Sequence, residues 1–99
     1  MKPEDKIVQA IKKYLREEEH LVFRYHGDGF GTIGHPDLYG ILSHPASLRG
    51  RAFFFEVKAP GEKPRPNQLA MLELIAESGG LAAWVVSVDE VKFWINEWA

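Results

Sequence analysis

The segment GHPDLYGIL, residues 34–42, opens with a proline and an acid and then runs apolar as far as Leu42. Later in the chain, AFFFEVKAP, residues 52–60, is more apolar still, yet it places Glu56 and Lys58 where valine or phenylalanine is expected. Strands that are covered on both faces read as continuous apolar runs, so both segments are typical of interior strands. The fold therefore has to explain why interior strands carry charge.

Three other segments have the periodicity of helices. In residues 4–19 the apolar positions fall on one face, with lysines and glutamates on the opposite face. A second helix is expected to begin at Pro66, which suits a first-turn position, and to end before Gly79. The pattern Ser87-x-x-Glu90 is typical of a capping box and predicts a last short helix. Its apolar stripe consists of Val91, Trp94, Ile95 and Trp98.

Four strands are expected between these helices, at residues 20–26, 37–42, 51–59 and 81–88. The loop 43–50 joins the second and third strands into a hairpin, and the second helix forms a crossover to the fourth strand. We therefore predict a single α/β domain over residues 1–99, with the element order α-β-β-β-α-β-α and a mixed β-sheet flanked by helices.

Composition excludes several classes of protein. The 99 residues include no cysteine, which excludes disulfides and thiolate metal sites and favours a reducing compartment. No apolar run approaches the roughly 18 residues of a membrane helix, and the first residues lack the hydrophobic stretch of a signal peptide, so we expect a cytoplasmic protein without a membrane partner. The net charge of −2 argues against coating of nucleic acid by charge alone. It does not exclude a nuclease, because metal-binding carboxylates lower the net charge.

The charged residues of the two apolar segments are expected to meet. If the hairpin strands pair antiparallel with opposed residue numbers that sum to 93, Asp37 lies opposite Glu56, with the two Cβ atoms about 5 Å apart. Two buried carboxylates so placed repel each other, and a divalent cation between them removes the repulsion. Lys58 emerges from the same face as Glu56, while the carbonyl of Val57 lies at the strand edge.

Two more polar residues are expected to face the sheet. Glu4 shares a helix face with Val8 and Ile11, so its carboxylate is predicted to point inward. Gln68 lies at the start of the second helix and shares a face with Leu72. Five polar groups are thus candidates for one site.

Each of these residues also has a purely structural interpretation. Asp37 can be a turn residue after a proline, and Glu56 with Lys58 can form a same-face ion pair on a surface edge strand. Glu4 can be an acid that favours the helix dipole in a first turn, and Gln68 an ordinary early-helix residue. Their joint occurrence is what favours the site.

Pro36-Asp37 followed by Glu56-Val57-Lys58 resembles the signature of the PD-(D/E)XK nucleases. More narrowly, the chain is similar to the stand-alone VRR-NUC domains of phages and bacteria. In that family a helix-one Glu, a G-x-P-D strand, E-V-K and a Gln on the next helix recur in this order. The resemblance covers nearly the whole chain, because residues 34–37 match G-x-P-D and residues 64–80 resemble the second helix.

The resemblance implies a restriction-endonuclease-like fold and Mg²⁺- or Mn²⁺-dependent hydrolysis of phosphodiester bonds. Asp37, Glu56 and the Val57 carbonyl would hold one or two ions, and hard cations suit such oxygen ligands. Lys58 would orient the attacking water or offset charge on the phosphorane. Glu4 would complete the outer ligand shell or a second metal site, and Gln68 would hydrogen-bond a metal-bound water or the phosphate.

The expected partner is DNA. Lys63 and Arg65, just before the second helix, are candidates for contacts to the DNA backbone, with solvated surface charge as the alternative for both. His35 is a candidate phosphate contact beside Asp37. Arg24, Arg49 and Arg51 are weaker candidates. The family resemblance favours a homodimeric Holliday junction resolvase acting on branched DNA in the cytosol of a bacterium or a phage-infected host. Alternatives are a flap or nicking nuclease and a catalytically silent DNA-binding module.

Other patterns carry less chemistry. Residues 29–34 spell G-x-G-x-x-G after a strand, but no helix follows, so no nucleotide cofactor is expected. The four histidines lack the spacing of zinc ligands and are expected on the surface or in loops. Phe93 lies off the stripe of the last helix and is a candidate for a subunit contact.

Overall fold

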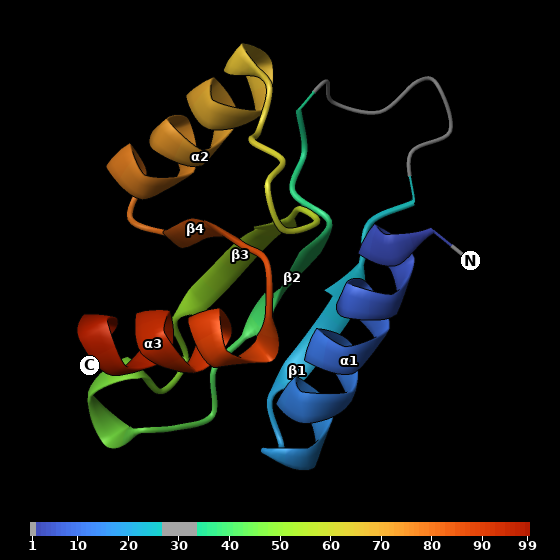
Figure 1. Cartoon of the computed structure of the whole chain (residues 1–99). Helices are drawn as coiled ribbons and strands as arrows, with labels where there is room; N and C mark the ends of the chain where they lie inside the picture. The colour runs from blue at the N-terminus through green and yellow to red at the C-terminus, as the bar shows by residue number, and fades with distance from the viewer. Residues whose placement is uncertain (1, 27–33) are drawn as a thin grey trace.

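The computed structural model describes residues 2–26 and 34–99 and has the predicted order of elements (Figure 1). The helices are α1 (Pro3–Glu17), α2 (Pro66–Glu77) and α3 (Val88–Trp98), and the strands are β1 (Leu21–Arg24), β2 (Leu38–Ile41), β3 (Ala52–Val57) and β4 (Leu81–Val85). The loop before β3 also contains one turn of 3-10 helix, η1 (Ala46–Leu48). No helix of the described residues is long and apolar enough to cross a membrane.

Several predicted boundaries were wrong. Helix α1 ends at Glu17, because Glu19 adopts a left-handed conformation with φ of 64°. Strand β4 ends at Val85, since Ser87 already caps α3 by accepting a hydrogen bond from the Glu90 N–H. The reciprocal bond of the capping box is shifted by one residue, because the Glu90 carboxylate accepts from the N–H of Val86. The glycine-rich segment 27–33 lies outside the described residues.

The sheet has the strand order β1-β2-β3-β4. Strands β1, β2 and β3 pair antiparallel, and β3 pairs parallel with β4 after the crossover through α2. The predicted hairpin register is confirmed, because Leu38 lies opposite Phe55 and Gly40 opposite Phe53. Asp37 and Glu56 are therefore the next opposed positions beyond this ladder.

One face of the sheet carries the hydrophobic core. The apolar stripe of α1 consists of Val8, Ile11 and Leu15. These residues are buried in one cluster with Phe55 and Val57 of β3, the two chain neighbours of Glu56. The stripe of α3 packs on the same cluster, as predicted, and Trp98 stacks on Phe55 with ring centroids 5.6 Å apart. This burial holds the first turn of α1 at the same end of the sheet as the end of β3 (Figure 1).

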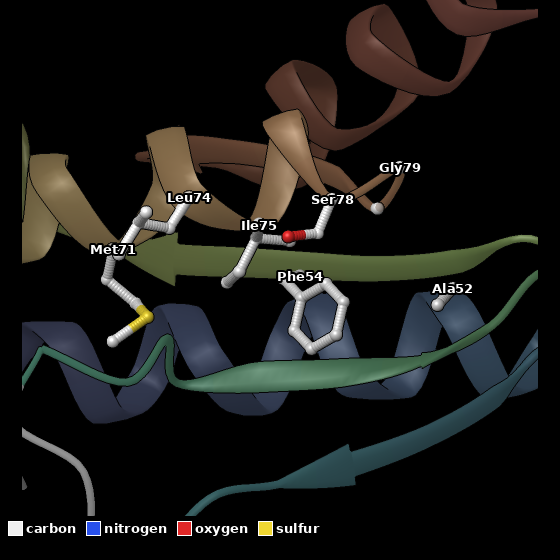
Figure 2. Close-up of a pocket in the computed structure, with 8 residues that line it drawn as sticks. Ala52, Phe54, Met71, Leu74, Ile75, Ser78 and Gly79 are labelled. Carbon is white, nitrogen blue, oxygen red and sulfur yellow. The ribbon is translucent and has the colours of Figure 1, made fainter.

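The other face is covered in part by α2. Met71, Leu74 and Ile75 of this helix, with Phe54 and Ala52 of β3, line a groove (Figure 2). Because α2 contacts β3 and β4, this face of β1 and β2 is left with exposed apolar side chains.

His20 lies in the connection between α1 and β1, in line with the expectation that the histidines lie on the surface or in loops. Its side chain is nevertheless buried, and it stacks on His44 with ring centroids 4.5 Å apart. The Nδ1 atom accepts a hydrogen bond from the N–H of Ser43. His20 therefore anchors the end of α1 to the loop after β2.

Candidate active site

Asp37 is held by both strands that flank β2. Its backbone carbonyl accepts a hydrogen bond from the N–H of Tyr25, and its Oδ2 atom accepts one from the N–H of Val57 at 2.8 Å. The half-buried side chain of Asp37 therefore bridges to β3. A simple turn residue would not need this contact.

Pro36 explains why Val57 can offer its carbonyl to a ligand. Hydrogen-bonded pairs alternate along the hairpin. The Leu42 N–H donates to the Arg51 carbonyl, and the same register places Pro36 opposite Val57. Proline has no N–H to donate. The ladder therefore leaves the Val57 N–H to the Asp37 carboxylate and supplies no donor to the Val57 carbonyl.

Glu56 and Lys58 are buried, with 3% and 9% of their surfaces exposed. Strand β3 lies between two neighbours in the sheet, so the interpretation of these residues as a surface edge strand is wrong. The Lys58 Nζ atom is 3.9 Å from the Oε2 atom of Glu56, and the Oε1 atom of Glu56 is buried with no hydrogen-bond partner among the described residues. Such an orphaned carboxylate oxygen is costly unless something binds it.

The electrostatics of the acid pair explain this cost. Burial raises the pKa of Glu56 to about 8, and the charge of Asp37 and a hydrogen bond with it act in the same direction. The ammonium of Lys58 opposes the shift and is outweighed. Near neutral pH the pair therefore holds a proton on Glu56 unless another cation joins it.

Glu4 lies within electrostatic reach of this pair, and sequence reasoning missed its neighbour Glu62. Burial is the main cause that raises the pKa of Glu4, and a hydrogen bond with Glu62 raises it further. The charge of Lys58 acts in the opposite direction. Glu62 follows β3 in a turn, where its N–H donates to the carbonyl of Ala59 at 3.0 Å. In the sequence an acid in the segment GEKPR is typical of a solvated loop, so no pattern pointed to Glu62.

Gln68 forms part of the N-terminal cap of α2. Its Oε1 atom accepts a hydrogen bond from the N–H of Arg65 at 2.8 Å, which leaves the amide nitrogen to donate elsewhere. Gly34, at the entrance to β2, lies against the same turn: a Cβ atom on it would be 2.7 Å from the carbonyl oxygen of Asn67. The start of α2 and the start of β2 are therefore in close contact.

The candidate DNA-binding residues have different environments. His35 is half-buried, donates from Nδ1 to the carbonyl of Pro36 at 2.7 Å, and stacks on Tyr25 with ring centroids 3.9 Å apart. This bond leaves Nε2 as the ring nitrogen that can accept a hydrogen bond. Lys63 and Arg65 are exposed. Two of the weaker candidates are engaged within the protein, since Arg24 pairs with Asp5 at 2.6 Å and Arg51 donates to the Gly79 carbonyl.

The donor set fits a hard divalent cation. Asp37, Glu56 and the Val57 carbonyl offer only oxygen atoms, which Mg²⁺ and Mn²⁺ prefer, and the orphaned Oε1 of Glu56 is the atom that a cation would satisfy. In residues 2–26 and 34–99 no three His, Cys, Asp or Glu side chains gather into a ready metal site. The inner donors would thus be two acids and one backbone oxygen, with Glu4 farther out.

Comparison with known proteins agrees with the fold. No protein-family model and no curated protein matches the chain. A solved structure described as "VRR_NUC domain" superposes with a TM-score of 0.78 at 28% identity over 100% of both chains. Another, described as "VRR_NUC domain protein", covers 98% of this chain and 88% of its own with a TM-score of 0.74, and at 16% identity it supports the fold alone.

Proposed function

Because the chain has the VRR-NUC fold along its whole length, we propose that the protein is a Mg²⁺- or Mn²⁺-dependent DNA endonuclease. The observation that carries the proposal is the orphaned, buried Oε1 of Glu56 opposite Asp37. A protein that only needed a stable core would place a neutral residue there, because a buried acid pair without a counter-ion is destabilising.

The residues of the site divide the chemical work. Asp37, Glu56 and the Val57 carbonyl would hold the ion, and Asp37 is oriented for this by the N–H of Val57. When bound, the ion supplies Lewis-acid polarisation of the phosphate and a bound water of lowered pKa. Lys58 is nearly buried beside Glu56, so its ammonium is fixed where it can orient the attacking water or offset negative charge on the phosphoryl oxygens.

The surrounding residues would position the substrate. The amide nitrogen of Gln68 can donate to a phosphate oxygen or a metal-bound water, because its carbonyl oxygen is fixed by the cap of α2. Glu4 would act in the outer ligand shell or at a second ion. Lys63, Arg65 and His35 would contact the DNA backbone, which sets affinity and register without reading sequence.

For the substrate we favour branched DNA cut by a homodimer, as in a Holliday junction resolvase. The small domain leaves little surface for reading bases, so recognition of DNA shape is expected. Two copies related by a two-fold axis would present two sites to the two symmetric strands of a four-way junction. The absence of cysteine suits work in a reducing cytosol.

A panel of labelled linear, flap and four-way DNA, each incubated with Mg²⁺, Mn²⁺ or EDTA, tests this proposal. We expect paired cuts in the junction that require the metal, with a dimer seen by light scattering. Asp37→Ala and Lys58→Ala should bind the junction and leave it uncut. Cutting in EDTA would overturn the metal role, cutting of flaps alone by a monomer would overturn the junction role, and binding without cutting would identify a silent DNA-binding module.

A further inference from the structure

An exposed sheet face lies directly beside the acid pair. Among the described residues, α2 covers this face over β3 and β4, while Leu21, Phe23 and Ile41 of β1 and β2 are 53%, 45% and 38% exposed. Large apolar side chains that are contiguous and exposed usually mark a binding surface. The active-site chemistry described above uses none of these three.

The part of this face nearest the acids is aromatic. Phe23 lies opposite Tyr39, and Tyr39 lies opposite Phe54, with ring centroids 5.5 and 6.4 Å apart. Tyr39 is two residues from Asp37 on the same face, which is about 7 Å along a strand and within the span of one extended nucleotide. Phe23, Tyr39 and Phe54 therefore lie side by side across three strands, on a line parallel to that of Asp37 and Glu56.

A further aromatic pair, Tyr25 and His35, borders the acids themselves. Tyr25 lies opposite Asp37 in the ladder and stacks on His35, and the His35 ring meets Tyr39 edge-on at 5.6 Å. Together with Phe23 and Tyr39, this pair forms one continuous aromatic surface from β1 to the active site. We call these four residues the aromatic row (Phe23, Tyr25, His35 and Tyr39).

We propose that the aromatic row is a stacking platform for the unpaired bases of the DNA substrate. The inference rests on the proposed function, because a phosphate held at the acid pair is what places the adjacent base over Tyr39. Aromatic faces stack on every base, so such a platform gives affinity for unpaired nucleotides without sequence preference. The platform would narrow the substrate class to DNA with unpaired nucleotides at the cut, as in flaps, open junction centres and single strands.

The chemistry of the row favours bases over a second copy of the chain. Tyr25, His35 and Tyr39 combine a flat ring with a polar group, which suits a base at a wet surface. Purely aliphatic residues, which pack well at subunit interfaces, lie at the far end of the face, where Leu21 pairs with Ile41. The ring faces are thus concentrated where the substrate phosphate would be.

Binding measurements test the platform apart from cleavage. Fluorescence anisotropy would compare a labelled single-stranded oligonucleotide of mixed sequence with an abasic oligonucleotide of the same length, both with Ca²⁺ in place of the catalytic ion. We expect wild type to bind the strand with bases about tenfold more tightly. Phe23→Leu and Tyr39→Leu keep apolar surface but lose the ring, so they should lose most of this preference. Phe93→Leu, which removes a 54% exposed aromatic from α3, is the matched control and should keep it.

Three results would overturn the platform: equal binding of both oligonucleotides by wild type, an unchanged preference in Phe23→Leu and Tyr39→Leu, or dissociation of a dimer by these variants in light scattering. The last would assign the face to a second copy. Metal-dependent cutting of junction DNA by the same wild-type sample tests the proposed function separately. Cutting without a base preference would overturn the platform alone.

Discussion

Replacing Glu56 by glutamine removes the ionisable group that makes the acid pair costly. The pKa of Glu56 is raised to about 8 from an ordinary 4.5, mainly by burial. Between these values the unfolded chain is ionised at this position and the folded protein holds a proton. Folding then takes up a proton, so the free energy of unfolding falls as the pH rises through this window and is highest at its acid end.

The size of the effect follows from this linkage. Each pH unit within the window changes the free energy of unfolding by at most about 1.4 kcal/mol. From pH 5 to pH 7 the metal-free wild type should therefore lose up to about 3 kcal/mol relative to Glu56→Gln, which does not titrate. Because His20 is present in both proteins, its own titration cancels in the difference.

Urea unfolding followed by tryptophan fluorescence in EDTA at several pH values measures the difference. Exposed Glu73 on α2 provides the control, since Glu73→Gln removes a carboxylate without changing the buried pair. Adding Mn²⁺ at pH 7 should stabilise wild type, by about 2.7 kcal/mol at one hundred times the dissociation constant, and should not stabilise Glu56→Gln. Parallel pH curves for wild type and Glu56→Gln would show that the Glu56 carboxylate is hydrated, and the reasoning from its burial would fail.

Three further predictions concern the scaffold and are measured by the same urea unfolding. Gly34→Ala should lower the free energy of unfolding by about 1 kcal/mol more than Gly61→Ala. Both glycines have positive φ, but only at Gly34 would the added Cβ atom meet a backbone oxygen, at 2.7 Å; equal losses would refute the contact. Burial and His44 lower the pKa of His20, so stability is lost as the pH falls below 6.5; the advantage of wild type over His20→Asn should shrink there, and a constant difference would contradict this. Ser87→Ala should cost about 1 kcal/mol through loss of the α3 cap, and a loss near zero would count against the cap.

Much of the fold could be predicted because its signals are local. Helical stripes, the proline at the start of α2 and the apolar runs of the strands repeat within a few residues, so the order of elements was confirmed. The hairpin register was also confirmed, since a loop of fixed length between two apolar runs leaves few ways to bury both. The errors lie at element ends, where Glu19 and Ser87 depend on backbone conformation and capping.

For the site, the sequence by itself determined which acids and which lysine are available and that Asp37 is placed to meet Glu56, because side-chain alternation and pairing follow from spacing. Only the tertiary structure decided how deeply Glu56 is buried, that Glu62 reaches Glu4, and that Gln68 caps its own helix. It also decided which sheet face α2 leaves open. Burial and solvation depend on atoms brought together from distant parts of the chain, and no local pattern of residues contains that information.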